Sequence, residues 1–372
     1  MHAEGGETAK AHARRLREGW YDQHIKAPCI DLGCGRDPLL APFPVRRWDI
    51  ILGDGDAQKL EGVPDNSYQT VYASHLLEHV VDPVAAVRRW YEILAPGGKL
   101  IICVPSRRLY EKKNAPPSRW NSDHKTFWEL EDGGPETTTY GLRNCVLRGT
   151  LTGEIISLRV LDEGYVSNGP NQHSSGEFSL ECVVRKPDFD TDILKNLARG
   201  HSTQGVEKLT AIYRELLRTD GLPGDVAEFG VWKGGTAKVI GYGAPGVPLH
   251  LFDTFSGMPE DDSDGGHHKG DFSDCDIESV RKFLDNPAAI FHVGIFPETA
   301  PPDVYYRFVH IDCDIRQSVE AALDYFPPRM VSGGVILFDD YNWPRCPGVK
   351  TAIHNRYDNV EVVGGNQAVL RF

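Results

Sequence analysis

Short apolar runs that end in an acidic residue and a glycine-rich turn occur twice along the chain. The first is "APCIDLGCGRDP" at 27–38, and the second is "GDVAEFGVWKGG" at 224–235. In each we expect a buried strand, a turn and the start of a helix. Later, each half has an amphipathic segment that ends at a glycine-containing turn before another apolar run, in "WYEILAPGGKLIICVP" and "ALDYFPPRMVSGGVILFDD". Strands that alternate with helices predict a mostly parallel sheet flanked by helices.

The chain therefore reads as one α/β architecture used twice. Its 372 residues exceed the size at which a single hydrophobic core usually stops growing. An alternating strand in 176–192 closes the first unit, and 193–219 reads as a helical lead-in to the second. We predict domains at 1–187 and 188–372. The long irregular stretch 111–141 is functional or disordered by its length, and its aromatic residues favour a substrate-covering element.

Composition narrows the range of partners and compartments. A net charge of −13 argues against broad binding of nucleic acid or of an anionic membrane surface. The eight cysteines form no C-x-x-C pair, which suits free thiols in a reducing compartment. The first thirty residues lack a secretory signal, and no run of about 18 apolar residues occurs. We expect a cytoplasmic protein with no membrane span and no nucleic-acid partner.

The first glycine-rich turn has the features of a small-molecule cleft. Asp31 ends the predicted strand, and Gly33 and Gly35 permit positive φ angles and close approach of a ligand to the backbone. Asp49 ends the next predicted strand, where a carboxylate can meet ribose hydroxyls. A P-loop lysine and a full dinucleotide fingerprint are missing, so a nucleotide phosphate fits this turn less well.

Further motifs follow this turn in a recognisable order. "DLGCG", "GDA", "LEH" and "PGG", spread over residues 27–127, resemble the broad class I family of small-molecule S-adenosylmethionine-dependent methyltransferases. The resemblance implies a Rossmann-like domain that binds S-adenosyl-L-methionine. It places along the cofactor the residues Asp31, Gly33 and Gly35 (methionine and ribose), Asp49 (ribose), and Asp56 with Ala57 (adenine edge).

Histidines in the first half suggest two further roles. His75, Glu78 and His79 could form a metal cluster, but we interpret them as residues that cap a helix and line the cofactor cleft. Asp123-His124, in the irregular stretch, is the better candidate for touching substrate. His124 is also the one identifiable catalytic base in this half. The alternative is a loop histidine held by its neighbouring carboxylate.

The second glycine-rich turn repeats the plan of the first. Glu228 lies at a strand end, and Gly230, Gly234 and Gly235 form the turn. Asp253 ends the next strand and is the candidate for the ribose contact. These five residues are our predicted cofactor-binding set in this half.

Carboxylates gather at the later strand ends of the second half. Asp312, Asp339 and Asp340 each follow an apolar run, so they should emerge together at the carboxyl edge of the sheet. Three converging carboxylates repel one another unless a cation lies among them, and oxygen ligands favour Mg²⁺, Mn²⁺ or Ca²⁺. The alternative is that Asp339 caps a turn and Asp340 is solvated. We interpret His267-His268 as part of a lid or solvated loop rather than as a second metal site.

The second half resembles the macrocin O-methyltransferase family of sugar methyltransferases and, more remotely, catechol O-methyltransferase. The stretches that carry the resemblance cover most of residues 221–357 and are "GLPGDVAEFGVWKGG", "FDTFSGMP", "GDFSD", "GIFPETAP", "VHIDCDIRQSVEAALDYFPPRMVSGGVILFDDY" and "PGVKTAIHNRY". The resemblance implies that Asp312, Asp339 and Asp340 are the metal ligands. It also implies that Asp312 lies near the hydroxyl that loses its proton.

Together these features predict two tandem Rossmann-like class I methyltransferase domains. The second would be an S-adenosylmethionine-dependent O-methyltransferase for a sugar or glycosylated acceptor with adjacent hydroxyls, with Asp312 or His310 as the catalytic base. Three roles stay open for the first domain: a second methyltransferase for the same glycan, a holding or dimerisation module without catalysis, or part of a sensor or scaffold without turnover. Dimerisation would make the protein a homo-oligomer.

Overall fold

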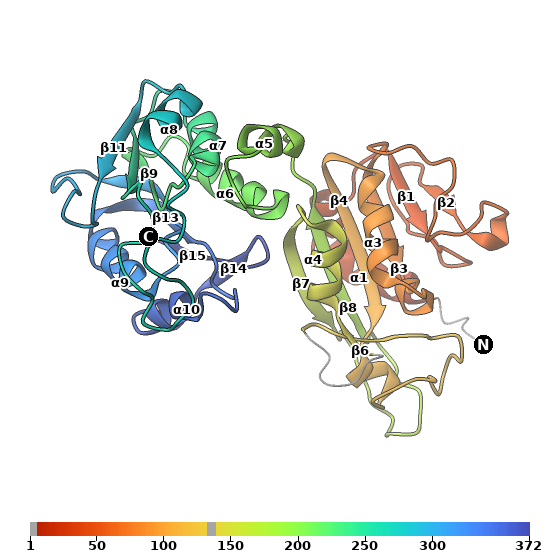
Figure 1. Cartoon of the computed structure of the whole chain (residues 1–372). Helices are drawn as coiled ribbons and strands as arrows, with labels where there is room; N and C mark the ends of the chain where they lie inside the picture. Colours follow the sequence, from red (N-terminus) through yellow and green to blue (C-terminus); the bar gives the residue numbers. More distant parts are fainter. Residues whose placement is uncertain (1–5, 132–138) are drawn as a thin grey trace. The chain divides into compact units, whose positions relative to one another are not determined.

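The computed structural model describes residues 6–131 and 139–372. The chain divides into two compact units, Met1–Phe189 and Asp190–Phe372 (Figure 1). This division lies two residues beyond the predicted one. Each unit is an α/β domain with its own sheet and core.

A six-stranded sheet forms the centre of the first unit. The strand order is β2-β1-β3-β4-β8-β7. The first four strands are parallel, and β8 and β7 are antiparallel to their neighbours. The strands are β1 (Cys29–Leu32), β2 (Arg46–Trp48), β3 (Tyr68–Ser74), β4 (Leu94–Pro105), β7 (Glu154–Leu161) and β8 (Ser179–Arg185).

Helices cover both faces of this sheet because its strands are apolar on both sides. Leu100 and Ile102 of β4 lie in one core with Trp90, whereas Ile101 lies in another with Trp20. The first face carries α3 (Pro83–Glu92) and α4 (Leu142–Thr150), and the second carries α1 (Glu7–Arg17) and α2 (Trp20–His24).

The predicted helix after the first glycine-rich turn does not form. Residues 36–45 contain no helix, and only a single 3-10 turn, η1 (Ile50–Leu52), follows β2. Three prolines in this stretch, at 38, 42 and 44, remove backbone donors and disfavour the helical conformation of the residues before them. The carboxylate of Asp31 instead accepts a hydrogen bond from the Leu39 backbone N–H at 2.7 Å.

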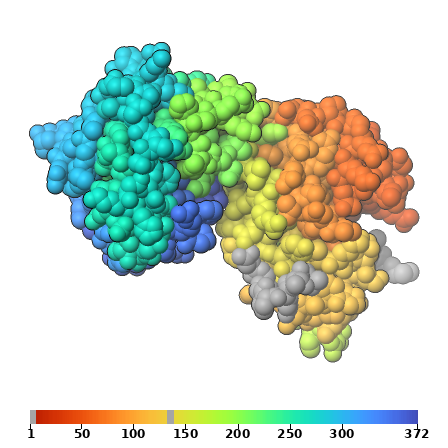
Figure 2. All heavy atoms as spheres, in the orientation of Figure 1, coloured from red at the N-terminus to blue at the C-terminus, as the bar shows by residue number. Residues whose placement is uncertain are grey.

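An extension continues from the carboxyl end of β4. It comprises η3 (Arg107–Glu111), β5 (Phe127–Glu129), β6 (Thr139–Gly141) and the 162–178 connection that leads into β8. The Lys112 ammonium donates to the carbonyls of Gly169 and Gln172, both at 2.8 Å, and so joins the two segments. Figure 2 shows pale green atoms of the connection beside gold atoms of the 106–131 stretch. The predicted irregular stretch is thus partly structured, and its residues 132–138 lie outside the described ones.

A seven-stranded sheet forms the centre of the second unit. The order is β11-β10-β9-β12-β13-β15-β14, in which the first five strands are parallel and the last two antiparallel. The strands are β9 (Asp225–Phe229), β10 (Leu249–Asp253), β11 (Ala289–Val293), β12 (Tyr306–Ile311), β13 (Met330–Phe338), β14 (Glu361–Val363) and β15 (Gln367–Arg371).

Two helical layers cover this sheet. Val226 of β9 packs with Ile212 and Ile240 on one face, whereas Ala227 packs with Val319 and Val349 on the other. The first layer contains α6 (Val206–Arg218), α7 (Gly235–Gly243) and α8 (Ile277–Leu284), with α5 (Thr191–Ala198) against α6 and α7. The second contains α9 (Arg316–Tyr325), η4 (Pro327–Arg329) and α10 (Pro347–His354). Helix α7 begins directly after the second glycine-rich turn, as predicted.

Two sequence-based predictions concern thiols and membranes. All eight cysteines are free, which confirms the first. Over the described ranges we find no helix with the length and apolar character that crossing a bilayer requires.

Candidate active site

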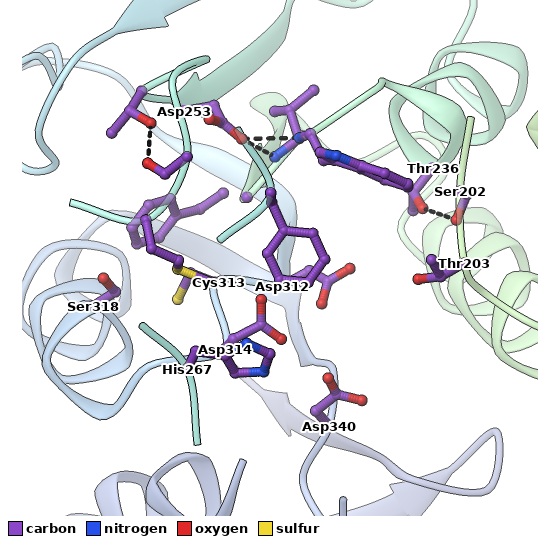
Figure 3. A pocket seen from close by; sticks show the side chains of 18 of the residues that line it. Ser202, Thr203, Thr236, Asp253, His267, Asp312, Cys313, Asp314, Ser318 and Asp340 are labelled. Carbon is purple, nitrogen blue, oxygen red and sulfur yellow. Dashed lines mark hydrogen bonds between the residues drawn. The ribbon is translucent and has the colours of Figure 1, made fainter. Parts of the chain in front are cut away.

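A cavity of about 680 Å³ opens at the carboxyl edge of the second sheet. Its wall combines the β9–α7 turn, the ends of β10 and β12, the 201–205 loop and the start of α6. Figure 3 shows Asp312, Asp314, His267 and Asp340 pointing into one region of this cavity, with Asp253 above them. The place where the parallel strands end is where open α/β sheets bind ligands.

The predicted glycines of this half have different roles. Gly230 lines the cavity with a φ of +90°, and a Cβ there would lie 1.9 Å from the Asp312 carbonyl oxygen. A side chain is therefore excluded where the ends of β9 and β12 meet. Gly234 and Gly235 are not among the lining residues. A Cβ on Gly235 would lie 2.6 Å from the His201 backbone, so this glycine lets α7 approach the 201–205 loop.

Asp253 is fixed at the cavity wall by backbone donors. One of its oxygens accepts the N–H groups of Val231 and Trp232 at 2.7 and 2.9 Å (Figure 3). The other oxygen accepts the Phe255 N–H at 2.7 Å. The strand-end acid therefore binds the glycine-rich turn directly and presents a preoriented carboxylate to the cavity.

Glu228 and His310 form a buried pair away from the cavity. They are register partners on β9 and β12, and the Glu228 carboxylate lies 3.0 Å from His310 Nδ1. Their side chains are 1% and 0% exposed, and neither residue lines the cavity. Burial raises the pKa of Glu228. Side chains alternate between the two faces of a strand, so these two point into a helical layer and not toward the sheet edge.

The three predicted carboxylates do converge. Oxygens of Asp312, Asp339 and Asp340 lie within 4.8 Å of one another. The Lys208 ammonium lies 3.0 Å from Asp339 and 2.8 Å from Asp340, and the Gln204 amide donates to Asp312 at 2.9 Å and also to Asp339. Asp339 and Asp340 are therefore neither a turn cap nor simply solvated. Burial, together with the neighbouring carboxylates, raises the pKa of Asp312 well above its usual range.

The sequence reading missed Gln204 and Lys208. Gln204 precedes α6 and Lys208 lies in its first turn, within the stretch read only as a helical lead-in. A lysine on an amphipathic helix carries no signal that distinguishes it from a solvated one. Its position over the carboxylates depends on how α6 crosses the sheet.

A thiol-containing cluster adjoins the carboxylates. The Cys346 sulfur lies 3.7 Å from His267 Nε2, 3.6 Å from Asp314 and 3.7 Å from Asp340. His267 is 6% exposed and lines the cavity, so of the two interpretations of this stretch, lid or solvated loop, the solvated one is wrong for His267. The adjacent His268 is exposed.

The strand-end acid of the first unit also binds its glycine-rich turn. Asp49 accepts the Gly35 N–H at 2.8 Å and the Ile51 N–H at 2.9 Å. This arrangement is similar to that of Asp253 in the second unit. Gly33 and Gly35 both have positive φ angles, of +64° and +49°.

The remaining predicted residues of this turn differ in exposure. Asp31 is 1% exposed, and burial raises the pKa of its carboxyl to about 7. Asp56 is exposed, and its carboxylate accepts the Gln58 N–H at 2.8 Å. The turn therefore combines a buried acid at the end of β1 with a solvated acid further along.

His124 of the first unit lies beside two glutamates, Glu111 and Glu78. From the sequence we had interpreted Glu78 as a helix cap. The Nδ1 atom of His124 lies 2.6 Å from Glu111, and its Nε2 lies 3.9 Å from Glu78. Glu78 caps no helix: its carboxylate is fully buried without a hydrogen-bond partner among the described residues, which corrects the capping interpretation. Burial raises the pKa of Glu78 to about 8.

Comparison with known proteins assigns both units. Residues 194–363 match the Macrocin-O-methyltransferase family, and residues 9–132 match a Methyltransferase domain family. The chain is 27% identical over 194 residues to the 8-demethyl-8-(2,3-dimethoxy-alpha-L-rhamnosyl)-tetracenomycin-C 4'-O-methyltransferase of Streptomyces olivaceus, an alignment that covers 46% of this chain and 73% of the relative. The chain is an S-adenosylmethionine-dependent O-methyltransferase. The resemblances to the macrocin O-methyltransferase family and to the class I methyltransferases are thereby confirmed.

Other relatives of this methyltransferase have related descriptions. The Mycinamicin III 3''-O-methyltransferase of Micromonospora griseorubida is 26% identical over 186 residues, which cover 43% of this chain and 71% of the relative. Among solved structures, the O-methyltransferase NovP matches with a TM-score of 0.41 and 23% identity, over 50% of this chain and 84% of NovP. These matches cover about half of the methyltransferase chain.

Proposed function

We propose that the C-terminal unit transfers a methyl group from S-adenosyl-L-methionine to a hydroxyl of a sugar on a glycosylated acceptor. The observation that carries this proposal is the geometry of one cavity, in which the Gly230 turn and Asp253 share a wall with the carboxylate cluster. The tetracenomycin relative supports a glycosylated acceptor, because its name includes a rhamnosyl group. The mycinamicin relative is likewise an O-methyltransferase.

Gly230 and Asp253 would hold the cofactor, which supplies an already activated methyl group. Gly230 lets the ligand approach the backbone without a side chain in the way. Asp253 is oriented by three backbone N–H groups, so its carboxylate needs no rearrangement to accept from ribose hydroxyls. Glu228 and His310 would support the sheet behind this wall, since neither lines the cavity.

Asp312 would accept the proton of the acceptor hydroxyl. Its carboxylate lines the cavity beside the other two carboxylates of the cluster, so a hydroxyl held at the cluster would lie within its reach. His310 was the alternative base, but it is fully buried and paired with Glu228. Positioning of the hydroxyl against the methyl group would contribute more, up to about 7–11 kcal/mol of the barrier at the extreme.

The carboxylate cluster has the donor set of a divalent-cation site. Asp312, Asp339 and Asp340 bring three carboxylates together against the single ammonium of Lys208. The excess negative charge and the oxygen donors fit Mg²⁺, or Mn²⁺ or Ca²⁺. Such an ion would orient adjacent hydroxyls of the acceptor and lower the pKa of one of them. Lys208 occupies the same space, so it would have to move when the ion binds.

Lys208 gives this proposal a sharp test. If a metal is used, EDTA abolishes methyl transfer to a glycosylated acceptor and Mg²⁺ restores it. Asp339→Asn and Asp340→Asn lose activity but keep cofactor affinity by calorimetry, because Asp253 lies apart from the cluster. Lys208→Met then binds Mg²⁺ more tightly, since no ammonium competes for the carboxylates.

The opposite set of results would mean that the Lys208 ammonium, and not a metal ion, supplies the positive charge that the carboxylate cluster needs. In that case activity persists in EDTA and is lost in Lys208→Met. Lys195→Met, at an exposed position on α5, is the matched control and should resemble the unaltered chain in both assays.

We further propose that the N-terminal unit binds its own S-adenosyl-L-methionine and methylates a second position of the same glycan. In its support, Asp49 binds the Gly35 turn in the way that Asp253 binds the second turn. Calorimetry should then count two cofactors per chain, and one after Asp49→Ala. A single cofactor in the unaltered chain would leave the unit as a holding or dimerisation module.

A further inference from the structure

A cluster of two histidines and one glutamate lies at the carboxyl edge of the first sheet. The Glu78 Oε1 atom is 4.0 Å from His79 Nε2 and 3.9 Å from His124 Nε2. One possible ligand atom from each of the three residues lies within 4.8 Å of the other two. These separations exceed hydrogen-bond length, yet they suit three ligands around a common centre after a small contraction.

Both histidines are held in the tautomer that a metal requires. His79 Nδ1 lies 3.0 Å from the Asp123 carboxylate, and His124 Nδ1 lies 2.6 Å from the Glu111 carboxylate. Each Nδ1–H is therefore donated, and each Nε2 turns a free lone pair toward Glu78. A carboxylate behind each ligating imidazole is the usual outer shell of a protein metal site.

The Glu78 carboxylate supplies an independent observation. It is 0% exposed, and neither of its oxygens has a hydrogen-bond partner within the described part of the chain. No lysine or arginine of the described residues pairs with Glu78 or Glu111. The nearest basic group is the His75 imidazole, whose Nδ1 lies 3.5 Å from Glu78 Oε1, and burial lowers the pKa of this histidine. A buried carboxylate without a cationic partner is costly unless it is protonated or binds a cation.

The backbone holds the two ligand segments together. The Glu78 carbonyl accepts the N–H groups of Lys125 and Thr126 at 2.8 and 3.2 Å, directly after His124. The ring planes of His79 and His124 are 79° apart with centroids at 4.9 Å, so the two imidazoles approach the centre from different directions. The cluster is therefore positioned by main-chain bonds and not by flexible side chains alone.

We propose that Glu78, His79 and His124 bind a divalent first-row transition-metal ion such as Zn²⁺ or Fe²⁺. Two imidazoles and one carboxylate are the ligand set that such ions favour. Three protein ligands leave coordination positions open, as in catalytic rather than structural sites. The His79 side chain is 26% exposed, which gives the ion a route from solvent.

The place of this centre in the fold suggests what it serves. Leu76, just before the cluster, packs on Gly33 of the first glycine-rich turn, with its side-chain atoms 2.7 Å from where a Cβ would be. An oxygen-donor acceptor bound at the open positions would thus lie beside the turn. The metal-binding inference itself does not rest on the function proposed for either unit.

Metal binding by the full chain tests the inference directly. After EDTA treatment and dialysis, the chain is titrated with Co²⁺, monitored by its visible absorption, and with Zn²⁺, monitored by calorimetry. Glu78→Gln, His79→Asn and His124→Asn should each lose one bound ion, with affinity falling by more than about 100-fold. Asp339→Asn and Cys346→Ser are matched controls that keep this ion, because they alter only the clusters of the other unit.

Outer-shell variants separate a metal site from a buried hydrogen-bond cluster. Glu111→Gln and Asp123→Asn leave the three ligands in place and should weaken Co²⁺ binding about 10–100-fold. If circular dichroism shows that Glu78→Gln does not fold, these two variants still test the metal site. Equal ion counts and affinities in the unaltered chain and in all five variants would overturn the proposal. So would the lack of any Co²⁺ binding by the unaltered full chain.

Discussion

Replacement of Asp31 by asparagine should change how the stability of the first unit depends on pH. The Asp31 carboxyl is 1% exposed, and its pKa rises from 3.8 to about 7, chiefly through burial. The native state therefore holds the proton more tightly than the unfolded state. The stabilising contribution is complete below about pH 4 and is lost as the pH rises toward 7.

The size of the effect follows from the shift. A displacement from 3.8 to about 7 corresponds to about 4 kcal/mol of unfolding free energy, at about 1.36 kcal/mol per unit. Asparagine keeps a carbonyl that can accept the Leu39 N–H, and it carries no ionisable group. The difference in unfolding free energy between Asp31→Asn and the unaltered chain should therefore shift in favour of the variant by about 4 kcal/mol as the pH rises from 4 to 8.

Urea unfolding is monitored by hydrogen-exchange mass spectrometry. This measures the unfolding free energy of each unit separately, because peptides from β1 and β3 report on the first unit alone. The comparison is made without cofactor at several pH values between 4 and 8. Asp56→Asn, which alters an exposed carboxylate, is the control, and its unfolding free energy should depend on pH as that of the unaltered chain does. If the unfolding free energy of Asp31→Asn shows the same pH dependence as well, the Asp31 carboxyl does not titrate as the burial argument requires, and the reasoning fails.

Three further predictions concern glycines and a buried ion pair. Gly230→Ala should destabilise the second unit by about 3 kcal/mol or more in chemical denaturation, because its Cβ would lie 1.9 Å from the Asp312 carbonyl oxygen at a φ of +90°. Gly35→Ala meets no atom within 4 Å at a φ of +49°, so its cost should be only about 1 kcal/mol in the same assay; similar losses for both would refute the steric argument. Arg14→Met leaves Glu177 buried without the guanidinium that donates to it at 2.8 and 3.0 Å, and the first unit should lose about 3–5 kcal/mol. Arg14→Met with Glu177→Met should recover part of that loss, and a double variant less stable than the single one would contradict this account.

The sequence by itself determined the architecture and the places where chemistry gathers. Apolar runs and turn residues act locally, so both sheets and the α7 start after Gly234 followed from pattern. The carboxyl ends of parallel strands share an edge, and this brought Asp312, Asp339 and Asp340 together in the prediction as in the structure. The helix expected after Gly35 failed for a reason that was also local, since prolines follow it.

The tertiary structure alone decided which side chains reach each site. Glu228 and His310 lie near strand ends, but their side chains point from one face of the sheet into a helical layer and not into the cavity. The apolar pattern of a strand does not indicate which of its side chains will line a cavity. Lys208 reaches the carboxylates only through the crossing of α6 over the sheet. His124 meets Glu78 because the Glu78 carbonyl binds the backbone that follows the histidine. Such contacts join segments far apart in the chain, whereas the periodicity of a sequence records only the neighbours along it.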